Sequence, residues 1–337
     1  MQQGTDQRPA RSQAHGPGLA WAVLALLSCC SLVAGESPAS SRAVFLPHWI
    51  PQAQFAGYYI AAERGFYRQQ GLEVEFLEGG PRKHVGQALA SGRADFASHF
   101  LSAALKSRDE RIPVVHLAQI TQRSALMLVG HKSHGIASVK DLDGKKVSLW
   151  ADFTAQPNAL FRKYNLRVNP IPQSRTINLF MRGAVDAASA MWHNEYHLFL
   201  NSGLNEDEVT VFFFDKYGLN FPEDSIICLR ETWRTRPEIC RKFVAATLEG
   251  WRYVLSHRAE TLETVMKRTE KAQTGTNRSH QRWMLDRMCE LIQPVDQGIA
   301  MGELSRDAYG RVARELKSSG QLQTAPAFED FHAPVRP

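Results

Sequence analysis

The chain has 337 residues, of which 44% are hydrophobic and 22% are charged. This composition is typical of a globular protein and excludes a disordered or collagen-like chain. The length suggests two domains, because one domain usually spans roughly 100–200 residues. Lys and Arg number 40 against 34 Asp and Glu, and the basic residues are scattered among acids, which argues against a nucleic-acid-binding surface.

Residues 1–35 are typical of a secretory signal peptide. Basic residues precede an apolar run from Leu19 to Leu27, and small residues follow it. The run is shorter than the roughly 20 residues that a membrane-spanning helix needs, so we expect an exported, periplasmic protein. Residues 26–29 also resemble a bacterial lipobox, which would leave Cys29 lipidated. Cleavage near Gly35 without a lipid is the alternative.

From Ala43 onward, short β-like runs alternate with amphipathic helices. We expect strands at 44–46 and 72–76, with a helix near 53–70 between them that ends at Gly71. This alternation predicts βαβ units and a mainly parallel sheet covered by helices.

One pattern occurs twice in the chain. An apolar-faced helix, a glycine and a strand of small residues stand at 85–97 and again at 177–188. Two widely separated copies predict two similar α/β lobes instead of a solenoid. The alternative is that any junction of helix, glycine and strand has this appearance.

Two extended stretches, 114–129 and 209–214, mark the crossings between the lobes. We therefore predict a first lobe at 43–127 and 213–337 and a second lobe at 128–212. Such a pair of lobes closes on a ligand by hinge bending. After Pro237 the apolar spacing predicts longer helices at 238–257, 259–269 and 279–291.

Three cysteines follow the signal segment, Cys228, Cys240 and Cys289. Their wide spacing and the lack of a Cys-x-x-Cys pair argue against a structural zinc site. We expect buried free thiols, with one disulfide as the alternative.

The sequence carries few catalytic signatures. It contains no Gly-rich phosphate loop and no Gly-x-Ser-x-Gly elbow. His193 and His197 have a spacing that can bind a metal on one helix face, but the acid lies between them and no third ligand is evident, so we expect no metal site. The alternative is that Asn194 and Glu195 hydrogen-bond a polar ligand in a cleft.

Four stretches place aromatic residues beside polar ones, at 48–59, 149–157, 191–197 and 215–221. A flat heterocycle needs ring faces to stack on and a few fixed donors or acceptors. Each stretch follows a predicted strand or hinge, and α/β sheets bind ligands beyond their strand ends. These stretches therefore predict a ligand cleft.

The segment 45–59, FLPHWIPQAQFAGYY, followed by AERGFY at 62–67, closely resembles the opening of periplasmic binding proteins for thiamine-pyrimidine precursors. That group shares its domain with sulfonate-binding proteins and with fungal thiamine pyrimidine synthases. The resemblance continues through 149–150, 191–196, 217–224 and 280–284.

This resemblance implies an α/β protein with the type II periplasmic-binding-protein fold, in which a two-crossing hinge joins two βα lobes around a ligand cleft. It also implies capture of an aminopyrimidine such as formylaminopyrimidine for thiamine biosynthesis or salvage. The partners would be a membrane permease and its ATPase, with the binding protein a monomer and with no chemistry on the ligand.

The synthase branch is the alternative. Those enzymes hold pyridoxal phosphate on a Lys, consume a His of their own and bind iron near a Cys-rich run. Aligned from Ala94-Asp95, the Lys position is His99 here, the His position is Ala103, and Cys228 alone remains of the Cys-rich run. A Schiff base needs an amine, so we expect a binding protein without a cofactor. A third possible function is that of an exported protein that senses a ligand.

We predict a cleft with aromatic walls in which Asn194 and Glu195 read the amino group and nitrogens of the ring, Glu195 as a charge-assisted acceptor. Each residue has a structural role as its alternative, because single aromatic residues more often belong to the core. The predicted ligand-binding residues are Trp49, Gln54, Tyr58, Tyr59, His99, Trp150, Trp192, Asn194, Glu195 and Tyr217.

Overall fold

The computed structural model describes residues 40–293 and 298–333. The predicted signal segment, with Cys29 and Gly35, lies outside these residues. Within the described part of the chain, no helix combines the length and the apolar character needed to cross a membrane.

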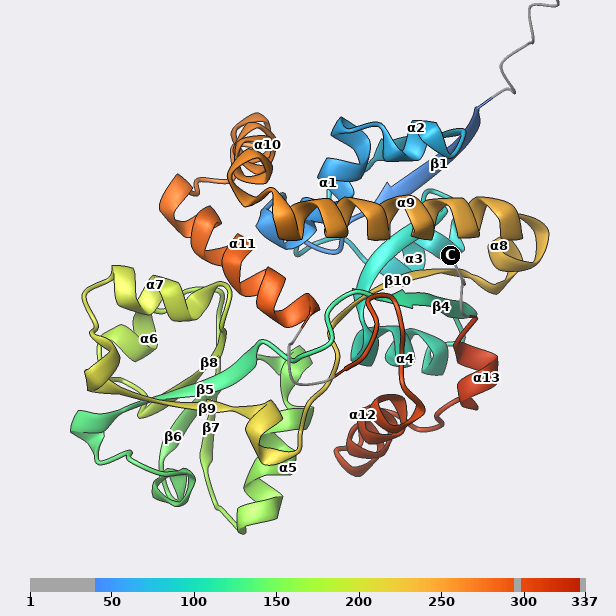
Figure 1. Cartoon of the computed structure of the whole chain (residues 1–337). Helices are drawn as coiled ribbons and strands as arrows, with labels where there is room; N and C mark the ends of the chain where they lie inside the picture. The colour runs from blue at the N-terminus through green and yellow to red at the C-terminus, as the bar shows by residue number, and fades with distance from the viewer. Residues whose placement is uncertain (1–39, 294–297, 334–337) are drawn as a thin grey trace, which may run out of the picture. The chain divides into compact units, whose positions relative to one another are not determined.

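Two five-stranded sheets form the framework (Figure 1). The first has the order β2-β1-β3-β10-β4, and the second has the order β7-β6-β8-β5-β9. The first sheet contains β1 (Ser41–Leu46), β2 (Leu72–Phe76), β3 (Phe96–Phe100), β4 (Val114–Gln119) and β10 (Asp224–Leu229). The second contains β5 (Leu126–His131), β6 (Lys146–Leu149), β7 (Asn169–Pro172), β8 (Ala187–Met191) and β9 (Val209–Phe213).

Both sheets are mixed but mainly parallel, as predicted, because only one of the described strands in each sheet runs against the others. Strand β10 runs antiparallel to β3 and β4, and β5 runs antiparallel to β8 and β9. The remaining pairs, β1–β2, β1–β3, β6–β7 and β6–β8, are parallel. Each antiparallel strand is the first strand after a crossing. It begins beside the last residues of its neighbouring strands and runs in the opposite direction to them.

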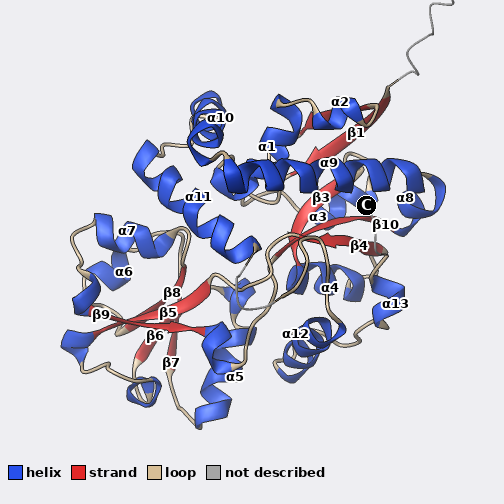
Figure 2. Ribbon diagram, viewed as in Figure 1, coloured by secondary structure: helices blue, strands red, loops and turns tan. Residues whose placement is uncertain are grey.

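Helices cover the sheets (Figure 2). Those before the first crossing and after the second are α1 (Ala56–Glu63), α2 (Phe66–Gln69), α3 (Val85–Ala90), α4 (Leu101–Asp109), α8 (Arg230–Thr235), α9 (Pro237–Ser256), α10 (Arg258–Lys271), α11 (Arg278–Ile292), α12 (Arg306–Ser318) and α13 (Phe328–Phe331). Those between the crossings are α5 (Ala155–Tyr164), α6 (Asn178–Met181) and α7 (Glu195–Asn201).

Local sequence signals explain several helix ends. The helix predicted at 53–70 is divided into a 3-10 turn (Ala53–Phe55), α1 and α2, because Gly65 takes a left-handed conformation with φ 74° between the two helices. Gly71 ends α2 with φ 68°, as predicted. Pro237 begins α9, and the three long helices expected after it are confirmed within two residues.

The repeated pattern is structurally equivalent in the two lobes. Gly92 and Gly183 both have positive φ, 71° and 64°. The carboxylate of Asp95 then accepts from the Val44 backbone N–H at 2.8 Å, and that of Asp186 accepts from Lys146 N–H at 2.8 Å. In each lobe the repeat therefore fastens the start of one strand to a neighbouring strand.

The two sheets are joined by crossings at 120–125 and 214–223. The buried carboxylate of Glu223 holds the crossings together, because its Oε1 accepts from Ser124 Oγ at 2.9 Å and from Ala125 N–H at 2.7 Å. The strands of the second sheet run from 126 to 213, whereas the predicted second lobe was 128–212. The lobe limits stay a prediction.

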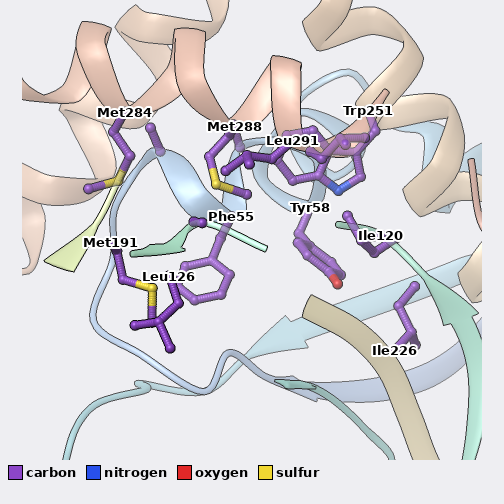
Figure 3. Packing of buried hydrophobic residues seen from close by; sticks show 14 of the residues in the cluster. Phe55, Tyr58, Ile120, Leu126, Met191, Ile226, Trp251, Met284, Met288 and Leu291 are labelled. Carbon is purple, nitrogen blue, oxygen red and sulfur yellow. The ribbon is translucent and has the colours of Figure 1, made fainter. Parts of the chain in front are cut away.

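One hydrophobic cluster includes residues from both lobes. Figure 3 shows Met284 and Met288 pointing from α11 towards Phe55 and towards Met191 at the end of β8. The three cysteines predicted as buried thiols are free and buried.

Candidate functional site

A polar cavity of about 210 Å³ lies between the two lobes. The first lobe contributes the loop after β1 and the segment that leads into α11, and the second lobe contributes residues at the start of α7. The lining residues are Trp49, Ile50, Pro51, Gln52, Asn194, Leu198, Thr274, Gly275, Thr276, Asn277, His280 and Gln281. The cavity therefore offers one indole, several amides and hydroxyls, and one imidazole.

The first residues of α11 fasten this wall of the cavity. Asn277 caps the helix, its side chain accepting from His280 N–H at 2.9 Å. One turn along, the Gln281 side chain accepts from the Ala53 N–H at 2.7 Å and so holds the loop after β1. A helix end and a strand-end loop, far apart in sequence, therefore form one wall.

The lobes meet across the cavity through a pair of histidines. Nδ1 of His197 on α7 and Nδ1 of His280 on α11 are hydrogen-bonded at 2.9 Å, one donating and the other accepting. His280 Nε2 is hydrogen-bonded to Asn194 Oδ1 at 2.9 Å. Burial, and then nearby His197, lowers the pKa of His280 to about 4; burial also lowers the pKa of His197. The contact therefore requires at least one neutral ring.

Behind the cavity lies a buried polar network at the strand ends of the first sheet. Gln52, which lines the cavity, donates to Gln54 Oε1 at 2.6 Å, and Gln54 donates to Asp224 Oδ2 at 2.9 Å. His48 Nε2 lies 3.6 Å from Asp224 Oδ1, and His48 Nδ1 is hydrogen-bonded to Ser98 Oγ at 2.9 Å. We name these five residues the floor network.

Four buried polar atoms at or beside the floor network have no hydrogen-bond partner among the described residues: Asp224 Oδ1, Tyr58 Oη, His99 Nδ1 and His193 Nδ1. Buried polar groups are nearly always paired, so this concentration indicates a place where a ligand supplies the partners. Burial raises the pKa of Asp224 to about 7 and lowers the pKa values of His99 to about 4 and His193 to about 3.

Glycine 79 supports the loop that carries Trp49. A Cβ at this position would collide with the backbone carbonyl oxygens of Pro47 and Trp49. We expect Gly79→Ala to displace the loop and to lower the free energy of unfolding by about 1–3 kcal/mol, as other overpacked sites do. Urea unfolding measures the change. Gly310→Ala is the control, because only the flexible Arg314 side chain lies near its added Cβ; equal effects of the two changes would contradict the expectation.

A family model described as NMT1/THI5 like matches residues 52–261, more than half of the chain. The chain belongs to the NMT1/THI5-like family. Among curated relatives, the riboflavin-binding protein RibY of Chloroflexus aurantiacus is 25% identical, over 89% of this chain and 91% of that protein. The 4-amino-5-hydroxymethyl-2-methylpyrimidine phosphate synthase THI13 of Saccharomyces cerevisiae is 23% identical, over 64% and 68%.

Solved structures show the same fold. The periplasmic aliphatic sulphonate-binding protein SsuA of Escherichia coli superposes with a TM-score of 0.69 at 16% identity, over 88% of this chain and 92% of that chain. At this identity the likeness concerns the fold alone. It confirms the prediction of the type II periplasmic-binding-protein fold for this NMT1/THI5-like chain.

Four of the predicted site residues lie at or behind the cavity of this NMT1/THI5-like protein. Trp49 and Asn194 line it. Gln54 belongs to the floor network, and the ring of His99 lies 6.3 Å from that of His48. Their contact with a ligand stays a prediction.

The structure does not bring the other aromatic residues to the cavity. Tyr58 and Tyr59 lie in the core of the first lobe with 1% and 2% of their surface exposed. Trp150 donates to the Ser174 carbonyl, and Tyr217 packs against Tyr164. Burial in the core explains the positions of Tyr58 and Tyr59, whereas Trp150 and Tyr217 stay partly exposed.

Trp192 has a bracing role between the lobes. The guanidinium groups of Arg123 and Arg287 lie over its ring, 5.2 and 4.9 Å from the ring centroid. Its carbonyl accepts from Trp283 Nε1 at 2.9 Å. The indole therefore joins α11 to the strand end of β8 instead of lining the cavity.

The Glu195 side chain is hydrogen-bonded to residues near it in the sequence. Its two carboxylate oxygens accept from Met191 N–H at 3.0 Å and from Asn194 Nδ2 at 2.8 Å. Burial raises the pKa of this carboxyl. Glu195 thus orients Asn194, and in this arrangement its oxygens are already used.

Sequence reasoning missed most of the cavity wall. His48 follows the carboxyl end of β1, where the rule for ligand sites in α/β sheets applies. Asp224 begins β10 and lies at the same end of the sheet only because β10 is antiparallel. The segment 274–281 carries no such signal, because it lies far along the chain before a long helix. Within this segment, only residues 280 and 281 belong to a stretch, 280–284, that carries the family resemblance.

Pyridoxal phosphate does not fit the donor set of this site. His99 stands at the aligned Lys position, and the described lining residues include no Lys or Arg. The Nζ of Lys106 donates to the Asp152 carbonyl at 3.2 Å. The cavity therefore offers neither an amine for a Schiff base nor a cation for the phosphate.

Residues for a metal are likewise not gathered in the described ranges: no group of three or more His, Cys, Asp or Glu side chains is placed to bind an ion. His197 is bonded to His280, and His193 lies close enough to His48 to lower its pKa. Cys228 is a buried thiol in β10 that donates to the Leu229 carbonyl.

Proposed function

We propose that the protein is an exported substrate-binding protein that captures a thiamine-pyrimidine precursor and presents it to a membrane permease and its ATPase. The observation that carries the proposal is the polar cavity between the lobes, with the Trp49 indole as a ring wall and amides around it. A two-lobed fold that encloses a small polar cavity suits capture and release of a ligand by hinge motion.

The size of the cavity favours a single ring. Its 210 Å³ is below the roughly 300–1,000 Å³ of pockets for drug-sized ligands. An aminopyrimidine has one ring with small substituents, whereas riboflavin has three fused rings and a sugar-alcohol chain. The proposal therefore prefers an aminopyrimidine to the ligand named for RibY.

The charge of the cavity favours a ligand without phosphate or sulfonate. The described lining residues carry no cationic side chain other than His280, whose pKa burial lowers to about 4. Anionic groups in proteins are held by Arg or Lys side chains or by helix N-termini; the described lining has neither Arg nor Lys, and the N-terminus of α11 borders it. We therefore propose binding without chemistry and without a cofactor, although several relatives are named as synthases.

A thermal-shift and calorimetry screen of the purified protein tests this proposal. The compounds are formylaminopyrimidine, 4-amino-5-hydroxymethyl-2-methylpyrimidine, its phosphate, riboflavin, pyridoxal phosphate and taurine. We expect the two uncharged aminopyrimidines to give the largest shifts, several degrees at saturation, because a ligand stabilises the form that binds it.

The phosphate is the matched control, since it differs from its parent by the phosphate group alone. We expect it to bind at least about tenfold more weakly, because the described lining has no Arg or Lys to offset burial of the added negative charge. The largest shift with pyridoxal phosphate, together with a Schiff-base absorbance, would support the synthase reading. The largest shift with riboflavin or taurine would replace the pyrimidine as ligand.

A further inference from the structure

The floor network lies where the lobes separate. His48, Gln54 and Asp224 come from the first lobe, and His193, which follows β8 of the second lobe, is close enough to His48 to lower its pKa. Opening of the hinge would uncover the network to a ligand, and closure would bury the ligand against it. Gln52 links the network directly to the cavity.

The network leaves one acceptor unpaired. Asp224 Oδ2 is used by Gln54, whereas Oδ1 is buried without a hydrogen-bond partner among the described residues. Both ring nitrogens of His48 already have a partner, because Nδ1 lies 2.9 Å from Ser98 Oγ and Nε2 lies 3.4 Å from Gln54 Nε2, an amide nitrogen that can only donate. Asp224 Oδ1, 3.6 Å from His48 Nε2, therefore remains as the unpaired acceptor of the network.

An unpaired buried acceptor matches the exocyclic amino group of an aminopyrimidine, which is a donor. We propose that Asp224 determines ligand specificity, with Oδ1 of its ionised carboxyl group accepting from this amino group. This inference rests on the proposed function, and it assigns recognition of the amino group to Asp224 instead of Glu195.

Glu195, the other candidate for recognising the amino group, already has hydrogen-bond partners for its oxygens. Both of its oxygens accept from the protein, whereas Asp224 retains a free oxygen with 3% of its residue surface exposed. An unpaired buried acceptor costs free energy that a ligand donor recovers. A ligand that lacks the donor leaves the cost in place, which is the usual source of strong discrimination.

The test compares 4-amino-5-hydroxymethyl-2-methylpyrimidine with its 4-oxo analogue by calorimetry. The oxo compound presents an acceptor where the amino compound presents a donor. We expect wild-type protein to prefer the amino compound by at least about tenfold. Equal affinities in the wild type would overturn the inference without any variant.

Asp224→Asn sharpens the test. Because Gln54 donates to Oδ2, the Asn oxygen will stay towards Gln54 and the Asn NH₂ will take the place of Oδ1. The variant should lose at least about tenfold in affinity for the amino compound and should bind the oxo compound as well or better. An unchanged ratio in a folded variant would overturn the inference.

Asp286→Asn is the matched control, an acid-to-amide change at a surface ion pair with Arg258, and it should keep the wild-type ratio. The outcomes separate the two proposals. Wild-type protein that binds no pyrimidine removes the proposed function and this inference with it. Wild-type binding with no amino preference removes the inference alone.

Discussion

Lowering the pH from about 7.5 to about 5 should weaken ligand binding by more than tenfold, because the closed lobes bury histidines that protonate in this range only when the lobes open. Nδ1 of His197 and Nδ1 of His280 bond each other across the lobes at 2.9 Å. A proton on each ring would place two positive charges in contact. We therefore expect acid to favour the open form.

The sign follows from the direction of the shifts. Burial lowers the pKa values of His99 to about 4, of His193 to about 3 and of His280 to about 4, against an ordinary value near 6.5. The contribution of these histidines to the stability of the closed form is complete above pH ~6.5, where their rings are neutral. Below this, each fully buried ring costs about 1.4 kcal/mol per pH unit until its own pKa is reached.

Calorimetric titration of the aminopyrimidine at a series of pH values measures the effect, with tryptophan fluorescence reporting the environment of Trp192 and Trp283. His197→Gln and His280→Gln keep hydrogen-bonding capacity but cannot take up the proton, so they should flatten the profile. His257→Gln is the control, because His257 is exposed and does not line the cavity. Superimposable profiles for all four proteins would contradict a role of the His197–His280 contact in the pH dependence.

The elements of the fold were largely readable from the sequence, because they depend on local signals. Apolar spacing placed the long helices, Pro237 began one of them, and Gly71 ended another. The direction of β5 and β10 could not be predicted from the sequence. The alternation of strands and helices does not show whether a strand that follows a crossing runs parallel or antiparallel to its neighbours. Only the tertiary arrangement of the crossings decides it.

The sequence predicted those site residues that come directly after strands. Trp49 and Asn194 come directly after β1 and β8 and line the cavity. Tyr58 carries the same aromatic and polar surroundings in sequence, but helix α1 turns its ring onto Phe45, with ring centroids 4.4 Å apart. A short sequence window cannot separate a ring that faces a cleft from one that faces the core of the same lobe.

The hinge gives the second large expected effect. Glu223 Oε1 accepts from Ser124 Oγ, from Ala125 N–H and, at 3.2 Å, from Leu126 N–H. Glu223→Ala would leave these buried donors without an acceptor, and we expect a loss of about 3–5 kcal/mol in the free energy of unfolding at pH 7. Urea unfolding measures it. Glu249→Gln, at an exposed ion pair with Arg252, should change little.

Glu223→Gln keeps an acceptor oxygen and so isolates the charge. Burial, then neighbouring Asp224, raises the pKa of Glu223 to about 8, whereas an unfolded Glu titrates near 4.3. The folded form therefore holds its proton more tightly, and this contribution to stability is complete below pH ~4.3 and is lost as the pH rises through about 8. The amide variant cannot lose a proton, so its stability relative to wild type should increase across this window. Parallel stability profiles would show that the hinge carboxyl is ionised in the folded protein. In that case the three donors, instead of burial, would decide its charge.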